Sequence, residues 1–301
     1  RSNTQAIDRF DMNQAPSYTD MHSSLWTLYY ASVFRCNEFL DKAENITWDN
    51  DSIKSVYLGE THAIRGICYF DMVRTWENIP LLIHATQDNV PQAAHDDVYA
   101  QIVTDLKFAA DNIPAKAYPK SQSASNDGHI TKYAAEAMLA RVYLFYDGYY
   151  NGNKGADMPG GLTKIQALAY CEDVIKSGEF GLVKRFKDLW PASSDDKTGN
   201  YLDHWVDKSS YAGVGNKESV LSMKFNYTAD YNGNDDGNRF VIMTGLRTNA
   251  NVYNRYGQGW GAMTVNMKQA AAYGQGDSRR QASIIDCQQL ANYEKTYLAD
   301  Q

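Results

Sequence analysis

The sequence predicts a mainly α-helical fold in which tetratricopeptide-like helix pairs carry a loop-rich, partly irregular ligand-binding face. Apolar residues recur every three or four positions in five segments of the first 180 residues, which is the period of an amphipathic helix. Short or moderate loops join these segments, as in stacked helix hairpins. After residue 180 this periodicity fades, and Gly, Asn, Asp and Ser become frequent, which is typical of loops.

The length of 301 residues suits one large domain or two ordinary ones. We expect a single domain over residues 1–301 with two portions. Residues 19–180 would form the helical base, and residues 181–301 would form the loop-rich binding portion.

The first helix pair is expected at residues 23–43 and 52–76. In the first segment Val33, Cys36 and Leu40 belong to one apolar face, as the helical period requires. Both segments are long enough for several turns, so they would form the first hairpin of the base.

The third helix is expected within residues 96–114, where Asp96 or Asp97 would cap its start and Pro114 would stop it. Residues 130–150 form the fourth helix. This segment is apolar nearly all round, which predicts burial on more than one side.

A fifth helix is expected within residues 163–180, with Thr163 as N-cap and Gly178 as C-cap. In the loop-rich portion, residues 218–227 alternate between apolar and polar side chains, which predicts a strand. Residues 263–274 are expected to form a short helix.

The second predicted helix carries charged residues inside an apolar pattern. Its stripe of small residues lets another helix pack closely, with a phenylalanine at its end: Gly59, Ala63, Gly66 and Phe70. Glu60 and Arg65 lie beside this stripe, where they would meet a neighbouring helix, and buried charges need partners. We expect Asp105 on the next helix to pair with Arg65, in a structural and not a catalytic role.

Charge and composition exclude several classes of protein. The net charge of −7 provides no overall basic field for nucleic acid. Charges interrupt every apolar stretch well before ~18 residues, so no membrane-spanning helix is expected. The cysteines are far apart and have no CxxC spacing, so we expect free thiols and neither a disulfide framework nor a zinc site: Cys36, Cys68, Cys171 and Cys287.

No motif for metal or cofactor chemistry is complete. The six histidines include no HExxH, so neither a catalytic metal nor a cofactor is expected. Residues 230–238 resemble a calcium loop, but Asp235 stands where glycine is needed in one register and Met243 where glutamate is needed in the other. A turn-rich loop is the favoured interpretation, with calcium as the alternative. The glycines at 257–261 lack a strand–turn–helix frame for phosphate.

Six segments in order resemble the SusD/RagB family of nutrient-binding lipoproteins on the outer membrane of Bacteroidetes: residues 26–40, 59–82, 98–114, 129–146, 217–227 and 276–285. The family's helix typically has the pattern GE-x-x-x-x-R-A-x-x-Y-F, followed by a short loop and Pro-Leu. "GETHAIRGICYFDMVRTWENIPLL" follows this pattern. Gly66 replaces the usual alanine, and Glu77 and Asn78 replace an aromatic-glycine loop.

Family members begin with a lipoprotein signal and an acylated cysteine, and they continue beyond the segment that corresponds to residues 276–285. We therefore expect this chain to be an incomplete, central portion. Association with the membrane through an N-terminal lipid anchor, not present in this chain, is implied by the resemblance alone.

The resemblance implies a binding protein and not an enzyme, located at the cell surface on the outer membrane. Such a protein captures oligosaccharide and delivers it to a SusC-like TonB-dependent transporter. Two alternatives remain open: the same architecture binding peptides, and an α-helical glycoside hydrolase, for which no carboxylate pair is singled out. A pure interaction scaffold is a minor fourth interpretation.

Contact residues vary across the family, so the expected ligand site rests on residue chemistry. Aromatic residues make up 13% of the chain, with 22 tyrosines, and sugar rings pack on aromatic planes while hydroxyl groups bind short polar side chains. Residues 226–240 and 251–261 combine both kinds, and residues 11–22 are a further candidate. The expected stacking platforms are Tyr227, Tyr231, Tyr256 and Trp260, and the expected hydrogen-bonding residues are Asn232, Asn234, Asp235 and Arg255. The alternative is that these rings pack the loops onto the helices or face the transporter.

Overall fold

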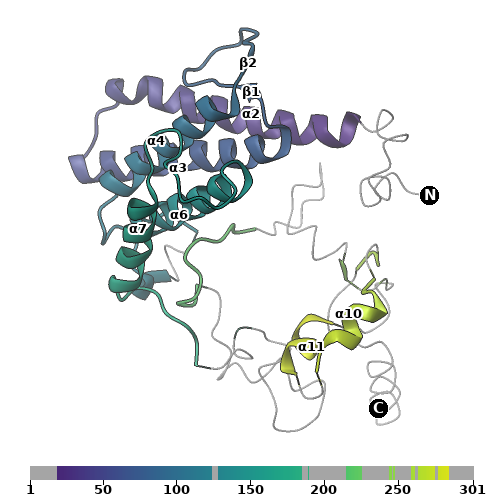
Figure 1. Ribbon diagram of the computed structural model, residues 1–301. Helices are drawn as coiled ribbons and strands as arrows, with labels where there is room; N and C mark the ends of the chain where they lie inside the picture. The colour runs from purple at the N-terminus through teal and green to yellow at the C-terminus, as the bar shows by residue number, and fades with distance from the viewer. Residues whose placement is uncertain are drawn as a thin grey trace, which may run out of the picture. The chain divides into compact units, whose positions relative to one another are not determined.

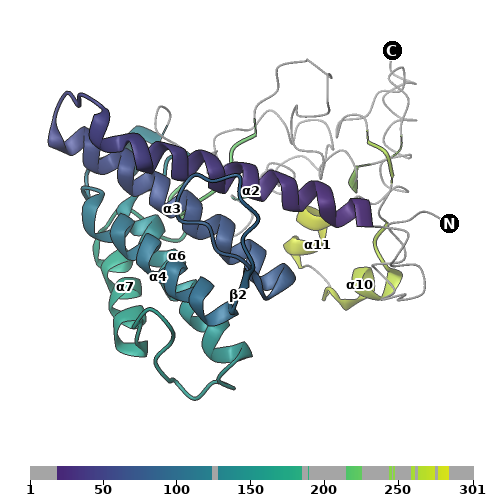
Figure 2. The ribbon, with the colours of Figure 1, turned by 90° about the horizontal axis from the view of Figure 1, so that it is seen from above.

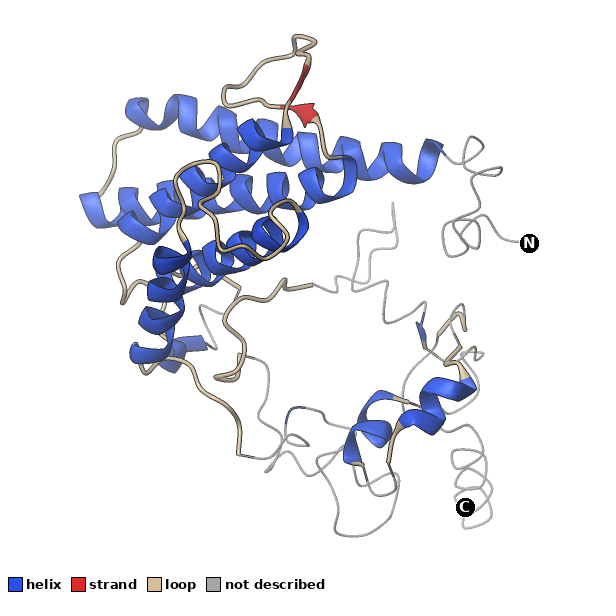
Figure 3. Ribbon diagram, viewed as in Figure 1, coloured by secondary structure: helices blue, strands red, loops and turns tan. Residues whose placement is uncertain are grey.

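The computed structural model is mainly helical, which confirms the predicted fold class (Figure 1, Figure 3). It describes residues 19–123, 128–184, 189, 215–225, 244–245, 247, 259–261, 264–274 and 277–284. The chain divides into two compact units, Arg1–Phe180 and Gly181–Gln301. Each unit is considered by itself, and the assignment of a base and a binding portion stays a prediction.

The described residues of the first unit include five long helices, and each packs against the next of these along the chain (Figure 2). This succession of antiparallel neighbours agrees with the expected tetratricopeptide-like helix pairs. Within the described residues no helix is long and apolar enough to cross a membrane. The five helices are α2 (Thr19–Lys42), α3 (Asp51–Trp76), α4 (His95–Asn112), α6 (Lys132–Tyr149) and α7 (Lys164–Lys176).

Short elements connect these helices. The strands β1 (Ile79–Pro80) and β2 (Gln92–Ala93) pair antiparallel between α3 and α4, and the loop between them projects from the helices (Figure 3). Single 3₁₀ turns follow α2 and precede α6, as η2 (Ala43–Asn45) and η3 (Lys120–Gln122).

The helix ends confirm one prediction and correct two. Thr163 caps α7 in a capping box with Gln166. The C-cap of α7 is Ser177 and not Gly178, which follows it with a φ of +72°, as glycine after a C-cap often does. Neither Asp96 nor Asp97 caps α4, because the helix begins earlier and its N-cap, Ala94, has no capping side chain. The two aspartates lie instead in the first turn, where negative charge favours the helix dipole.

The small-residue stripe on α3 allows the close approach to α4 that the sequence predicts. A β-carbon on Gly59 would lie 2.3 Å from Ile113 Cγ1, and one on Gly66 would lie 3.2 Å from Leu106 Cγ. Ala63 between them is fully buried. The two glycines therefore make room for the side chains of Ile113 and Leu106 against the α3 backbone.

The described cysteines are free thiols, as predicted: Cys36, Cys68 and Cys171. Burial raises the pKa of Cys36 to about 11 and that of Cys68 to about 12, so both stay protonated and unreactive at neutral pH. Cys287 lies outside the described residues.

The second unit corrects two sequence predictions. Residues 215–225, the described part around the strand predicted at 218–227, form turns and bends and no strand. Asn216 closes a turn there, because its side-chain oxygen accepts from Glu218 N and its backbone oxygen accepts from Ser219 N. These local hydrogen bonds take the place of the inter-strand bonds that the alternation of apolar and polar residues predicted. The helix expected at 263–274 is shorter, as α10 (Met267–Ala272), and α11 (Ser278–Ser283) follows it.

Candidate functional site

A buried ion pair joins α3 to α4, as the sequence predicts. Arg65 donates to Asp105 through Nε at 2.9 Å and through Nη2 at 2.6 Å, and the two residues are 4% and 0% exposed. Burial opposes the charge, but the bonds to Asp105 outweigh this effect and raise the pKa of Arg65. His62 Nδ1 and Gln101 Nε2 also contact the Asp105 carboxylate. The charges of this helix therefore have structural partners.

The same network holds the loop after α3. Arg65 Nη1 donates to Asn37 Oδ1 of α2 at 2.7 Å, and Asn37 Nδ2 donates to the backbone oxygens of Leu82 and His84. The Tyr69 hydroxyl donates to Leu82 O and accepts from Leu82 N. The segment from Leu82 to His84 is thus bonded to α2 and α3, close to the base of the loop that projects between β1 and β2.

Glu60 also has a structural role. Its carboxylate accepts hydrogen bonds from Ile130 N and the Tyr118 hydroxyl, and it lies 2.9 Å from His129 Nδ1. The rings of Tyr118 and His129 stack at 4.2 Å. This acid on α3 therefore anchors the connection between α4 and α6.

Of the predicted ligand residues, Trp260 is the one that the structure describes, and its backbone is closely packed. Gly259 forms a parallel bridge with Arg247, and a β-carbon there would lie 2.3 Å from the Gly245 carbonyl carbon. Gly261 N donates to Gly245 O at 2.9 Å, and Gly261 has a φ of +60°. The glycine spacing noted in the sequence therefore serves backbone contact. Trp260 itself is 49% exposed.

The other predicted contacts lie outside the described residues: Tyr227, Tyr231, Asn232, Asn234, Asp235, Arg255 and Tyr256. The same holds for residues 230–238, the calcium-loop candidate, and for residues 11–18 of the N-terminal candidate loop. Within the part of the chain that the structure describes, no group of three or more metal-binding side chains occurs.

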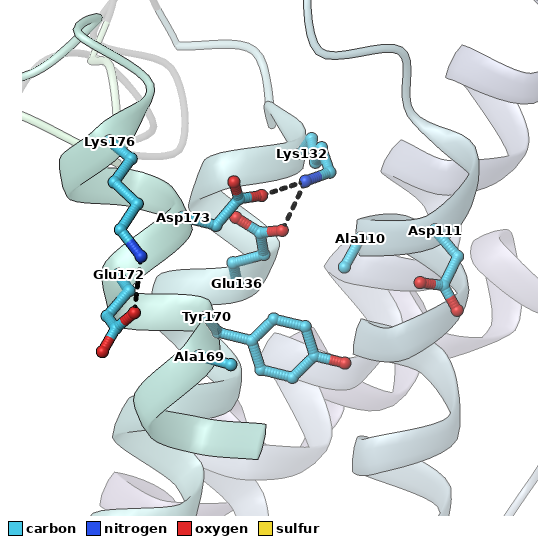
Figure 4. Close-up of a pocket in the computed structure, with 9 residues that line it drawn as sticks. All are labelled: Ala110, Asp111, Lys132, Glu136, Ala169, Tyr170, Glu172, Asp173 and Lys176. Carbon is cyan, nitrogen blue, oxygen red and sulfur yellow. Dashed lines mark hydrogen bonds and ion pairs between the residues drawn. The ribbon is translucent and has the colours of Figure 1, made fainter. Parts of the chain in front are cut away.

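A hollow of about 470 Å³ opens on the helical unit (Figure 4). Its wall is formed by α4, α6 and α7, and the Tyr170 side chain lies across it from α7 towards α4 (Figure 4). Two alanines leave the space open, and apart from Tyr170 the rest of the lining is charged. The lining residues are Ala110, Asp111, Lys132, Glu136, Ala169, Tyr170, Glu172, Asp173 and Lys176.

Three charged groups form one cluster in this wall. Lys132 Nζ donates to Glu136 Oε1 at 2.6 Å and also bonds to Asp173 of α7. Burial raises the pKa of Glu136 to about 7, whereas the bonds from Lys132 and Glu136 lower the pKa of Asp173. Burial also disfavours the ammonium, but the bonds to Asp173 and Glu136 raise the pKa of Lys132 overall.

Carboxyl groups with separated pKa values are what a general acid and base require. Geometry opposes that role here, because the Glu136 side chain is 3% exposed. Its Oε1 is bonded to Lys132, and its Oε2 is buried. Glu136 is therefore not placed to reach a substrate, although Asp173 is half-exposed at the hollow.

The sequence contains one indication of this cluster, which is the spacing of two of its charged residues. Lys132 and Glu136 are four residues apart in a segment that is apolar nearly all round, so the two charges share one helix face. The third member, Asp173, comes from another helix, and nothing in its local sequence indicates the contact.

Comparison with protein families gives one match. The model SusD-like_3, described as starch-binding and associating with the outer membrane, matches residues 2–144. These residues include α2, α3, α4 and most of α6, which carry the Arg65 network and the Glu60 contacts.

Individual relatives agree with this match. A SusD-like protein of Bacteroides ovatus is 26% identical over 77% of this chain and 43% of its own length. The crystal structure of a SusD-like protein from Bacteroides fragilis is 24% identical, with a TM-score of 0.57 over 84% of this chain and 42% of that one. A laminarin-binding SusD-like protein is 24% identical, with a TM-score of 0.60 over 89% and 54%.

The chain thus spans less than half the length of the curated relative and about half, or less, of the two solved structures. Within that span the family model, the relatives and the helix succession all agree. In sequence and in fold, this chain is therefore similar to the SusD-like proteins.

Proposed function

We propose that this chain is part of a cell-surface protein that captures oligosaccharide and has no catalytic activity of its own. Similarity to the SusD-like proteins supports the proposal, since one structural neighbour is named for laminarin binding and the matching family model is described as starch-binding. The burial of Glu136, whose side chain is 3% exposed, supports the absence of an acid–base pair at this hollow.

The observation that carries the proposal is the setting of Trp260. Its ring is half-exposed on a backbone that contacts Gly245 and Arg247 at both neighbouring residues. An aromatic plane on a preorganised backbone suits the C–H face of a sugar, because little conformational entropy is lost on binding. The predicted platforms Tyr227, Tyr231 and Tyr256 would extend this surface.

The captured oligosaccharide would pass to a SusC-like TonB-dependent transporter. Delivery implies location at the outer membrane, with the protein held there by an N-terminal lipid anchor. The description of the matching family model as associating with the outer membrane supports this location.

Substitutions at the aromatic platforms test the proposal. We expect Trp260→Ala to weaken binding of a laminari-oligosaccharide, or of the best binder in a glycan panel, about fivefold. We expect the double variant Tyr231→Ala and Tyr256→Ala to weaken it roughly 30-fold, because each stacked ring contributes on the order of 1 kcal/mol. Isothermal titration calorimetry measures both values.

The matched control is Tyr149→Ala, which removes a 69% exposed ring from α6 and should leave affinity unchanged. Full affinity in the Trp260 and tyrosine variants would place the site elsewhere. Binding to a peptide library and to no glycan would favour the peptide alternative, and steady release of sugar products from a bound glycan would identify a hydrolase.

A further inference from the structure

The interface between α6 and α7 contains a buried oxygen atom whose bonding needs an explanation. Glu136 Oε2 is inaccessible to solvent and has no hydrogen-bond partner among the described residues when the group is written as a carboxylate. Its sister atom Oε1 accepts from Lys132. A buried acceptor left without a donor costs free energy, so an unseen proton is the simplest completion.

The charges of the cluster lead to the same conclusion. Two carboxylates, Glu136 and Asp173, share one ammonium, Lys132. Both carboxyl groups bond to the same nitrogen, Lys132 Nζ, which holds them next to each other (Figure 4). Neighbouring carboxylates that cannot both ionise favourably bind one proton between them.

We propose that Glu136 is protonated and donates a hydrogen bond from Oε2 to Asp173, so that one proton clasps α6 to α7. The proton then satisfies the buried oxygen, and Lys132 balances the remaining charge on Asp173. Because Asp173 is about half-exposed at the hollow, the proton can leave to solvent there. Loss of the proton leaves two facing carboxylates with one cation.

Among the described residues, Lys132 is the cation bonded to the pair, and the charge of Lys176 acts on Asp173 from the same hollow. From α4 the hollow receives Asp111, which adds negative charge, and Tyr170 of α7 is neutral. Lys176 is bonded to Glu172 on its own helix. The clasp therefore weakens as pH rises through neutrality.

Proton linkage gives the direction in which folding stability changes with pH. The pKa of Glu136 is raised by burial from its ordinary value of 4.5 to about 7, so between these values the native state holds a proton that the unfolded chain has lost. The contribution of Glu136 to stability is complete below pH 4.5 and is lost as pH rises to about 7.

Carboxyl ¹³C NMR of the whole chain, labelled at glutamate, tests the proposal, with the Glu136 signal assigned by its loss in Glu136→Gln. We expect its titration midpoint near pH 7 and a downward shift of that midpoint in Asp173→Asn. A midpoint in the ordinary glutamate range would overturn the proposal. A raised midpoint that Asp173→Asn leaves unchanged would also overturn it, because burial alone would then explain the shift.

Stability provides a second readout. Glu136→Gln keeps the shape of the protonated group, so its denaturation midpoint should equal that of wild type near pH 4.5. The midpoint should exceed that of wild type by an amount that grows up to about pH 7 and then levels off. The control Glu38→Gln, in an exposed Glu–Lys pair on α2, should parallel wild type across this range. Parallel curves for Glu136→Gln and wild type would contradict the clasp.

Discussion

Arg65→Ala is expected to lower the free energy of unfolding by about 3–5 kcal/mol, because it leaves a buried aspartate without its cation. Asp105 would keep its contacts with His62 and Gln101, but it would lose both bonds of the bidentate pair. Asn37 Oδ1 would lose its donor as well. Denaturant unfolding followed by circular dichroism measures the effect.

The control for this variant is Lys42→Ala, which removes the cation of an exposed pair with Glu38 on α2. Exposed pairs contribute roughly 0–1 kcal/mol, so the midpoint should hardly move. An Arg65→Ala protein as stable as wild type would show that the buried pair contributes nothing, and it would reopen a functional role for Arg65.

Tyr69→Phe and Tyr99→Phe are expected to differ in stability, although both remove one hydroxyl group from a fully buried tyrosine. The Tyr69 hydroxyl bonds to both backbone groups of Leu82. Its removal leaves the Leu82 N–H unpaired, at a cost of about 1–3 kcal/mol. The Tyr99 hydroxyl has no hydrogen-bond partner among the described residues, so its removal should be neutral or stabilising by up to about 1 kcal/mol.

The two phenylalanine variants are controls for each other, since side-chain volume and helix propensity change equally. Thermal and denaturant unfolding should order them as Tyr99→Phe at or above wild type and Tyr69→Phe below it. The reverse order would mean that the Leu82 bonds are weak in solution or that water satisfies the Tyr99 hydroxyl. The Tyr69 result also measures how firmly the loop after α3 is held.

Local patterns in the sequence determined the helical unit. The apolar period places α2, α3, α4, α6 and α7 correctly, since each helix buries one face and the period records that face. The small residues Gly59 and Gly66 predicted the close approach of α3 to α4. A buried charge beside that stripe needs a partner of opposite charge, and the predicted partner of Arg65, Asp105, is confirmed.

The tertiary structure decided what depends on contacts between distant segments. Alternation at 218–227 predicted a strand, but a strand needs a partner, and the described residues 215–225 close on themselves through Asn216. The glycine spacing beside Trp260 indicates no function in the sequence, and only the fold brings Gly259 against Gly245. Most of the predicted ligand residues lie outside the described part, so that site stays a prediction.

Glu136 shows most clearly why a local sequence pattern does not predict the charge state of a buried group. Sequence alone determined that Lys132 and Glu136 share one face of a helix, because four residues make about one turn. Only packing brings Asp173 from another helix to the same lysine and withdraws Glu136 from solvent. A local period records which face of a helix is buried, whereas the charge and proton state of a buried group depend on every element that surrounds it.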